Sequence, residues 1–193
     1  MTGRLALKSF TTLALMIAAA IPMASNAVEV KPVLRAGFDF GGDTIATATF
    51  TSGKTDSIKA NDGLYVGVGA SILLDSKDIE IETTLSYKYT SITASNGDIT
   101  WTRFPLDALV FYRMPKYRVG GGLTYHMSPK LSGSGVVGGL NVKVDDALGV
   151  VLQGDYLLTP KLNMGLRYTN LSYKANGVTA KSNGAGITFG FVF

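Results

Sequence analysis

The chain has 193 residues, a formal net charge of +4 and no cysteine. Its length fits a single domain. Without cysteine there is neither a disulfide nor a thiolate metal site, and the single histidine, His126, lacks the clustered partners of a metal-ligand set. No run of Lys or Arg offers an electrostatic footprint for nucleic acid. We therefore expect no metal, no cofactor and no nucleic-acid partner.

The first 27 residues differ in character from the rest. Arg4 and Lys8 precede an apolar run over residues 11–24, and small residues follow at Ser25 and Ala27. This order is typical of a secretory signal peptide. A retained anchor is the alternative, but the run is shorter than the ~20 residues that a membrane-spanning helix needs. We predict cleavage after Ala27.

The mature domain, residues 28–193, alternates polar and apolar side chains with the strand period of two. In "DIEIETTLSYKY", for example, Glu80, Glu82 and Lys88 share one face, while Leu85 and the isoleucines share the other. Eight segments show strand character, with a length of about ten residues that suits a membrane strand. They are residues 33–40, 63–75, 78–89, 102–112, 117–127, 147–158, 161–170 and 183–193.

The connections alternate in length. Tight turns are expected at residues 75–78, 114–117 and 159–161, and longer loops at 41–62, 128–146 and 174–182, with 94–98 as a short exception. Short turns on one side and longer loops on the other are typical of an outer-membrane barrel. We predict an all-β fold, an eight-stranded antiparallel up-and-down transmembrane β-barrel, with both termini at the periplasmic turn side.

The apolar face carries aromatic residues near both ends of the strands. This arrangement indicates the two interfacial girdles of a membrane barrel, with lipid around the aliphatic residues between them. A soluble barrel would instead point its apolar residues inward. The predicted girdle residues are Tyr87, Tyr89, Tyr125 and Tyr168 at the loop end and Tyr112, Tyr117, Tyr156 and Phe193 at the turn end.

The polar face carries five acidic and five basic residues, and an eight-stranded barrel leaves a bore that side chains just fill. Buried charges must pair, so we expect Arg35, Arg103, Arg118 and Arg167 to pair with the acids in one connected network. The main interpretation is a plugged, charge-paired lumen; the alternative is a narrow channel for small solutes. The predicted lumen residues are Arg35, Asp39, Glu80, Glu82, Lys88, Arg103, Asp107, Arg118, Asp155 and Arg167.

The chain ends in "FGFVF", with Phe189, Phe191 and Phe193 on one face of the last strand. This ending resembles the carboxy-terminal signal of Gram-negative outer-membrane β-barrel proteins, which the barrel-assembly machinery reads. The whole mature chain resembles in pattern the small eight-stranded class of OmpA, OmpX and OmpW-like barrels. The resemblance implies an outer-membrane location, contact with lipid and lipopolysaccharide, and a structural, envelope or surface-interaction role.

One local motif suggests an enzyme. His126 and Ser128 in "YHMSPK" resemble the His-x-Ser pair of the lipid A deacylase PagL, in which a histidine would act as base for a serine nucleophile. The match departs at Pro129, where that family has Asn. Both side chains are expected to point inward, away from a lipid substrate, unless a bulge at Gly120–Gly122 changes the register. We therefore expect no catalysis, with a PagL-like esterase as the alternative.

Two loops are candidates for contact with other proteins. Residues 41–62 are rich in threonine and alternate in "TIATATF", which predicts an extension of the strands above the membrane. Residues 128–146 are rich in glycine and serine and unusually apolar, which would suit a lid over the mouth or a partner surface; an ordinary mobile surface loop is the alternative for both segments. We expect a monomer that meets an envelope or surface protein through these loops.

Deleting Phe193 should lower the amount of assembled barrel, because the change removes the terminal aromatic residue of the predicted assembly signal. The measurement is the fraction of outer-membrane protein that migrates differently with and without boiling. Assembly of the truncated chain at the wild-type level would contradict the signal.

Overall fold

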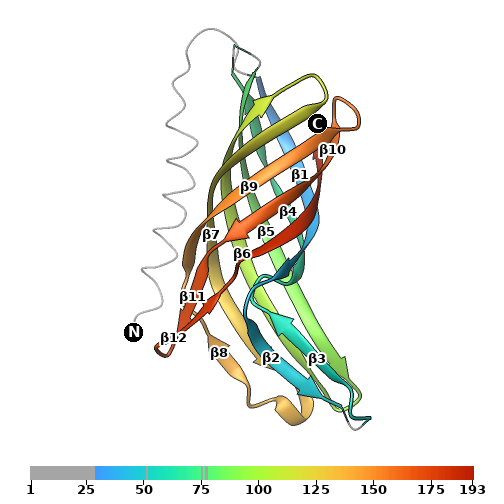
Figure 1. The fold of residues 1–193 in the computed structure, drawn as a ribbon, viewed down its shortest axis with the longest axis vertical. Helices are drawn as coiled ribbons and strands as arrows, with labels where there is room; N and C mark the ends of the chain where they lie inside the picture. Colours follow the sequence, from blue (N-terminus) through green and yellow to red (C-terminus); the bar gives the residue numbers. More distant parts are fainter. Residues whose placement is uncertain (1–28, 51, 75, 77) are drawn as a thin grey trace.

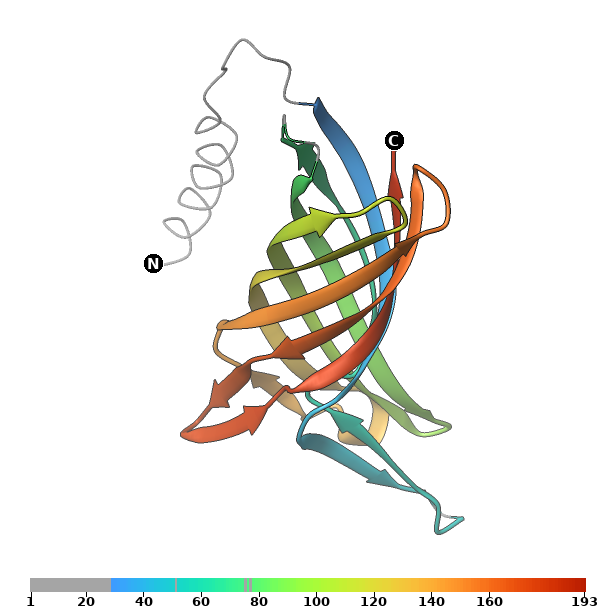
Figure 2. The same ribbon diagram turned by 45° about the horizontal axis from the view of Figure 1, so that its top comes forward.

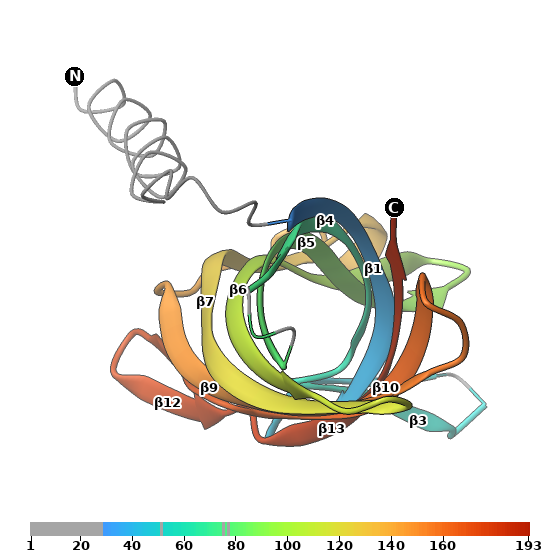
Figure 3. The same ribbon diagram turned by 90° about the horizontal axis from the view of Figure 1, so that it is seen from above.

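The computed structural model describes residues 29–50, 52–74, 76 and 78–193. The expected signal peptide and its cleavage site after Ala27 lie outside the described residues. Within them, eight antiparallel strands form a closed ring (Figures 1 and 3). The barrel strands are β1 (Glu29–Gly41), β4 (Gly63–Leu73), β5 (Ile79–Ala94), β6 (Gly97–Arg113), β7 (Tyr117–Gly133), β9 (Ala147–Leu157), β10 (Leu162–Asn170) and β13 (Gly184–Val192).

The ring closes where the first and last strands pair. β1 hydrogen-bonds to β4 on one side and to β13 on the other, so that Arg35 lies opposite Gly67 and Gly190. Each remaining strand pairs with its neighbours in chain order. Closure satisfies the backbone groups that an open sheet would leave at its edges. The predicted all-β, eight-stranded antiparallel barrel is therefore confirmed.

The alternation along each strand separates two faces. On β1, Arg35 and Asp39 are buried inside the ring, whereas Leu34, Phe38 and Phe40 point outward and are exposed. The same division holds on β9, where Leu148 and Leu152 are more than 60% exposed while Asp155 is buried. The outer wall is thus apolar and the bore is polar, the reverse of a soluble barrel.

Aromatic side chains cluster on the outer wall near both ends of the strands. Tyr87 stacks on Tyr89, with ring centroids 6.1 Å apart, towards the loop end. At the other end, Tyr117 packs edge-on against Tyr156 at 5.3 Å, and Phe191 packs edge-on against Phe193 at 5.0 Å. The outer wall therefore carries two aromatic bands with aliphatic side chains between them.

The two ends of the barrel differ. At one end, the connections between the described strands are short, from Leu73 to Ile79, from Arg113 to Tyr117 and from Leu157 to Leu162. This end also holds both ends of the described main chain: Glu29 pairs with Leu73, and the Phe193 amide donates to the Pro32 carbonyl. We call it the turn end, and the opposite end the loop end. No helix among the described residues is long and apolar enough to span a membrane.

The loop end carries additional short elements. Two hairpins, β2–β3 and β11–β12, continue beyond the barrel and diverge from each other (Figure 2). A 3₁₀ turn, η1, leads to a short strand that pairs back onto β7. The bounds are β2 (Thr44–Thr49), β3 (Thr55–Lys59), η1 (Gly135–Val137), β8 (Asn141–Lys143), β11 (Ser172–Ala175) and β12 (Val178–Lys181).

Three strands exceed the predicted length of about ten residues by six or seven residues. β5 has 16 residues, and β6 and β7 have 17 each, because their pairing continues at the loop end beyond the outward apolar band. As a result β7 reaches Gly133, and the third loop begins at residue 134 rather than at 128 as predicted. The predicted extension of the first loop above the barrel is present as the β2–β3 hairpin.

Glycines on the inward face make room for long charged side chains. Gly190, in the terminal "FGFVF", faces the bore between Phe189 and Phe191. A side chain there would collide with the Arg35 guanidinium and the Asn163 amide. The terminal motif thus serves both faces, with phenylalanines outside and space for Arg35 inside.

Candidate functional site

The bore contains all ten charged residues of the predicted lumen set. Each is buried, and the most exposed of them, Arg167, is only 8% accessible. Most of their head groups cross the bore and meet residues from strands that are not neighbours in the sheet, as Arg35 of β1 meets Glu82 of β5. These cross-bore contacts form two clusters, one towards each end of the barrel.

The turn-end cluster is centred on Arg118 of β7. Its guanidinium donates to Glu80 at 2.5 Å and Glu82 at 2.9 Å on β5, and to Asp155 on β9 at 2.8 Å. The same group lies over the Phe111 ring, 4.1 Å from its centroid. Charge-assisted hydrogen bonds of this kind are stronger than neutral ones, so Arg118 ties three strands together.

Arg35 joins the same cluster from the opposite wall. It forms a bidentate pair with Glu82, with distances of 2.6 and 2.7 Å, and it also donates to the Asn163 side chain at 2.7 Å. Glu80 receives two further hydrogen bonds, from Ser71 and Arg113. Three guanidinium groups thus face three carboxylates, and the cluster is electrically balanced.

The second cluster lies towards the loop end and consists of two separate ion pairs. Lys88 binds Asp39 at 2.5 Å, and Arg167 binds Asp107 at 3.0 Å. The Arg167 guanidinium also lies 5.4 Å from the centroid of the Tyr65 ring. The arrangement differs from the expected single network, because no ion pair among the described residues links this cluster to that of Arg118.

Arg103 departs from the predicted pairing. In the described part of the chain it lies within ion-pair distance of no carboxylate. Its guanidinium donates instead to the main-chain carbonyls of Asn61 at 3.0 Å and Asp62 at 2.7 Å, and stacks on Trp101 at 5.3 Å. The reason is that the end of the first loop dips into the mouth of the bore and brings its carbonyls to Arg103.

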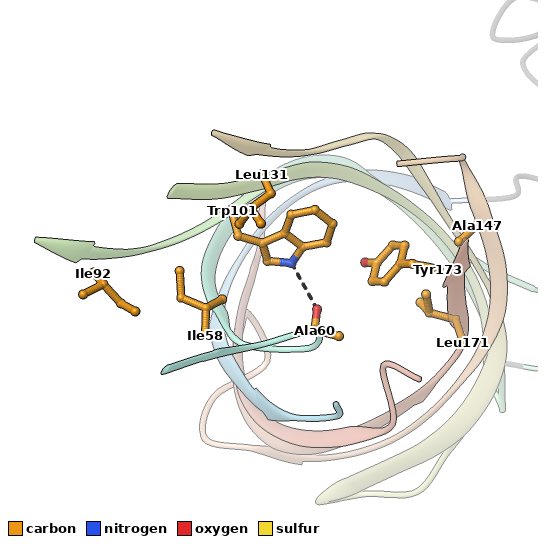
Figure 4. Packing of buried hydrophobic residues seen from close by; sticks show 8 residues of the cluster. All are labelled: Ile58, Ala60, Ile92, Trp101, Leu131, Ala147, Leu171 and Tyr173. Atoms are coloured by element: carbon orange, nitrogen blue, oxygen red, sulfur yellow. Dashed lines mark hydrogen bonds between the residues drawn. The ribbon is translucent and has the colours of Figure 1, made fainter. Parts of the chain in front are cut away.

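Between the charged bore and the loops at the loop end lies a layer of buried apolar residues that we call the apolar cap (Figure 4). Trp101 packs edge-on against Tyr173 at 5.2 Å, and its indole N–H donates to the Ala60 carbonyl at 3.1 Å. Burial raises the pKa of Tyr173 to about 12, so its hydroxyl keeps its proton at neutral pH. The buried residues of the cap are Ile58, Ala60, Ile92, Trp101, Leu131, Ala147, Leu171 and Tyr173.

The sequence analysis did not identify this cap. Its residues come from the first loop, the loop ends of β5, β6 and β7, the start of β9, and the fourth loop. The only signal was the apolar character of residues 128–146, whose Leu140, Val142 and Val144 pack against the cap. Sequence reasoning also missed Asn163 and Ser71, neutral partners whose type gives no sign that they face charges.

The structure separates His126 from Ser128. His126 is buried in the bore, as predicted, and its Nδ1 hydrogen-bonds to the Tyr173 hydroxyl. Ser128 was expected to point inward as well, but it is exposed. A bulge, located here and not at Gly120–Gly122, adds one residue to β7 opposite Arg103 and reverses the alternation.

The bulge has its own support. Ser128 adopts a left-handed backbone with φ of 49°, which is uncommon outside glycine. The Asp146 carboxylate accepts hydrogen bonds from the Ser128 amide at 2.7 Å and from the Tyr125 hydroxyl at 2.9 Å. Asp146 therefore anchors the bulge.

Little space remains between the charged side chains. A cavity in the loop-end cluster, between Asp39, Lys88, Asp107, His126 and Arg167, has a volume of about 10 Å³. That is close to the least volume that holds one water molecule. Within the described ranges, no group of three or more His, Asp or Glu side chains is arranged to hold a metal ion.

Comparison with known proteins gives structural matches only, since no family model and no curated protein matches. The structure is similar to outer membrane protein H (OprH) of P. aeruginosa, with a TM-score of 0.53 and 14% identity over 84% of this chain and 99% of that one. It is similar to Ail, the attachment invasion locus protein of Yersinia pestis, in complex with the heparin analogue sucrose octasulfate. That match has a TM-score of 0.52 and 10% identity over 85% of this chain and 97% of that one.

Neisserial surface protein A (NspA) also matches, with a TM-score of 0.45 and 15% identity over 84% of this chain and 94% of that one. At such low identities the likeness to OprH and Ail establishes the fold alone. The chain has the fold of the small eight-stranded outer-membrane barrels.

Replacing Arg118 by alanine should lower the free energy of unfolding by about 3–5 kcal/mol, because Glu80, Glu82 and Asp155 would each lose a buried partner. The measurement is urea-induced unfolding of the barrel in lipid vesicles. Lys54→Ala, in the exposed first loop, is the control and should change stability little. Equal stability of the two variants would show that the Arg118 cluster contributes nothing.

Proposed function

We propose that this chain is an integral outer-membrane barrel that does not conduct solutes and acts in envelope structure or surface interaction. The observation that supports the proposal is that two layers of side chains lie across the bore along its length. The ion pairs of Arg118, Arg35 and Arg167 cross the polar bore, and the apolar cap covers it at the loop end. An open pore would need a continuous aqueous path, which these two layers interrupt.

The outer wall supports the membrane location. A continuous band of exposed aliphatic side chains between two aromatic bands is unfavourable in water and matches a lipid bilayer with its interfaces. The asymmetry of turns and loops supports an orientation with the loop end outside the cell and both termini in the periplasm. Lipid, lipopolysaccharide and, during biogenesis, the barrel-assembly machinery are then its expected partners, with the chain itself a monomer.

The loop end is the part available to other molecules. The β2–β3 hairpin and the β11–β12 hairpin extend beyond the barrel, and residues 41–62 and 128–146 remain the candidate contact loops for an envelope or surface protein. A PagL-like esterase is not favoured. His126 is bonded to Tyr173 inside the barrel, whereas Ser128 lies on the other side of the wall, so the base cannot reach the nucleophile.

Planar-bilayer recording tests the occluded bore. The purified protein should give no steady single-channel currents, because ion pairs and the apolar cap leave no water-filled path. Removing the side chain of Arg103 should open little conductance, since the apolar cap and the other charged side chains of the bore remain. Large, steady currents from the unmutated protein would favour the narrow-channel alternative and make transport the leading function.

Labelling in whole cells tests the orientation. Because the chain has no native cysteine, only the introduced cysteine can react with the label. Lys54→Cys in the first loop and Lys116→Cys in a turn are both exposed positions. A membrane-impermeant maleimide should label only Lys54→Cys in intact cells and both variants after lysis. Labelling of Lys116→Cys in intact cells would reverse the proposed orientation.

A further inference from the structure

One histidine and one tyrosine connect the buried charges of the bore with a hairpin beyond it. His126 of β7 and Tyr173 of β11 are both buried, and the His126 Nδ1 atom is hydrogen-bonded to the Tyr173 hydroxyl. Their ring centroids lie 5.8 Å apart. His126 lines the cavity between the loop-end ion pairs, whereas Tyr173 belongs to the apolar cap. This contact therefore joins the two layers that lie across the bore.

The ionisable groups around His126 carry an excess of positive charge. Three are cations, two are carboxylates and two are tyrosines, and they come from six different strands. They are Asp39, Tyr65, Lys88, Arg103, Asp107, Arg167 and Tyr173. Within the sheet itself, His126 lies between Pro105 of β6 and Ala147 of β9, neither of which is charged.

Both carboxylates near His126 already bind another cation. Asp39 binds Lys88 and Asp107 binds Arg167, so that neither is free for the imidazole. Over the described ranges of the chain, no carboxylate lies within ion-pair distance of the His126 ring. The third cation, Arg103, lies beside Tyr173 and has no carboxylate to offset its charge there.

A proton on His126 would increase this imbalance. The ring would become a fourth cation opposite two carboxylates, and an unpaired charge in a buried site is costly. Charging also changes the bond to Tyr173: a neutral ring can accept a hydroxyl proton at Nδ1, whereas a charged ring is a donor at both nitrogens. The buried arrangement therefore requires a neutral histidine, and a charged one is favoured only where water reaches it.

The hairpin that carries Tyr173 has few other buried side chains. β11 and β12 have four residues each, and of these eight residues only Tyr173 is buried. Leu171, just before β11, packs in the same cap. Segments with few buried contacts open at a lower free-energy cost than the barrel to which they are attached. A change at Tyr173 can therefore move the hairpin while the barrel strands stay paired.

We propose that His126 and Tyr173 form a proton-sensitive contact, which holds the β11–β12 hairpin at the mouth while His126 is neutral and releases it when His126 takes up a proton. The sign follows from linkage: the released state binds a proton that the closed state does not, so the closed state loses stability as the pH falls. The change is expected as the pH falls below about 6.5, where an exposed histidine becomes charged.

Trp101 reports on this contact. It is the only tryptophan in the chain, and it packs edge-on against Tyr173 within the cap (Figure 4). Release of the hairpin would expose the indole to water. The full mature chain is reconstituted in phosphatidylcholine nanodiscs, and quenching of its fluorescence by acrylamide, an uncharged quencher, is measured as a function of pH.

The quenching constant of the unmutated protein should rise at least about twofold between about pH 7.5 and about pH 5, and should return when the pH is restored. In His126→Gln the constant should not rise over this range, because the amide can still form a hydrogen bond to Tyr173 but takes up no proton. All other ionisable groups of the layer are common to both proteins, so the difference isolates His126.

A second pair of variants tests the route through Tyr173. Tyr173→Phe keeps an aromatic ring against Trp101 but lacks the hydroxyl that bonds to His126, and should lose most of the pH dependence. Tyr168→Phe, on the outward face of β10, is the matched control and should respond to pH as the unmutated protein does.

Three results would overturn the proposal. The first is a quenching constant that does not change with pH in the unmutated protein, and the second is an equal rise in His126→Gln. The third is loss of the heat-dependent gel mobility of the unmutated protein after the acid step, which would show unfolding of the barrel. If His126→Gln does not fold, the tyrosine variants decide, and an equal rise in Tyr173→Phe and Tyr168→Phe overturns the proposal.

Discussion

The charged residues buried inside the barrel are the constraint on which the rest of this structure depends. Ten Asp, Glu, Lys and Arg side chains are buried there, and a charge on any of them would be strongly destabilising without a partner. Arg118 and Arg35 meet this requirement with short, charge-assisted hydrogen bonds to Glu80, Glu82 and Asp155 across the bore. The barrel wall must hold these groups in register, because a slip of one residue would turn them towards the outside.

The two ends of the barrel meet the constraint differently. At the turn end, three guanidinium groups and three carboxylates, all carried by barrel strands, balance one another's charge. At the loop end, Arg103 has no carboxylate partner in the described residues and depends on carbonyls of the first loop. These hydrogen bonds hold the loop at the mouth of the bore. The indole N–H of Trp101 adds another hydrogen bond, to the Ala60 carbonyl of the same loop.

This fixed loop connects the interior with the outer surface. The segment from Ala60 to Asp62 lies at the mouth of the charged bore, where its carbonyls accept hydrogen bonds from Arg103, and Ala60 packs with Trp101 and Tyr173 in the apolar cap. The contacts of this loop with Arg103 and with the apolar cap therefore belong to one packing arrangement.

The sequence by itself determined the barrel, because a period of two along eight segments assigns polar and apolar side chains to opposite faces of the wall. Arg35 is thereby separated from Leu34, and Glu80 from Ile81, independently of the loops. The same alternation identified the ten lumen residues and placed His126 inside.

Only the tertiary structure decided which groups these side chains contact. Arg103 met loop carbonyls, and Ser128 turned outward at a bulge anchored by Asp146, 18 residues along the chain. The apolar cap too depends on contacts such as that of Trp101 with Tyr173, which lie far apart in sequence. Local periodicity carries no information about such contacts, because they form only when the closed barrel brings the loops together over its mouth.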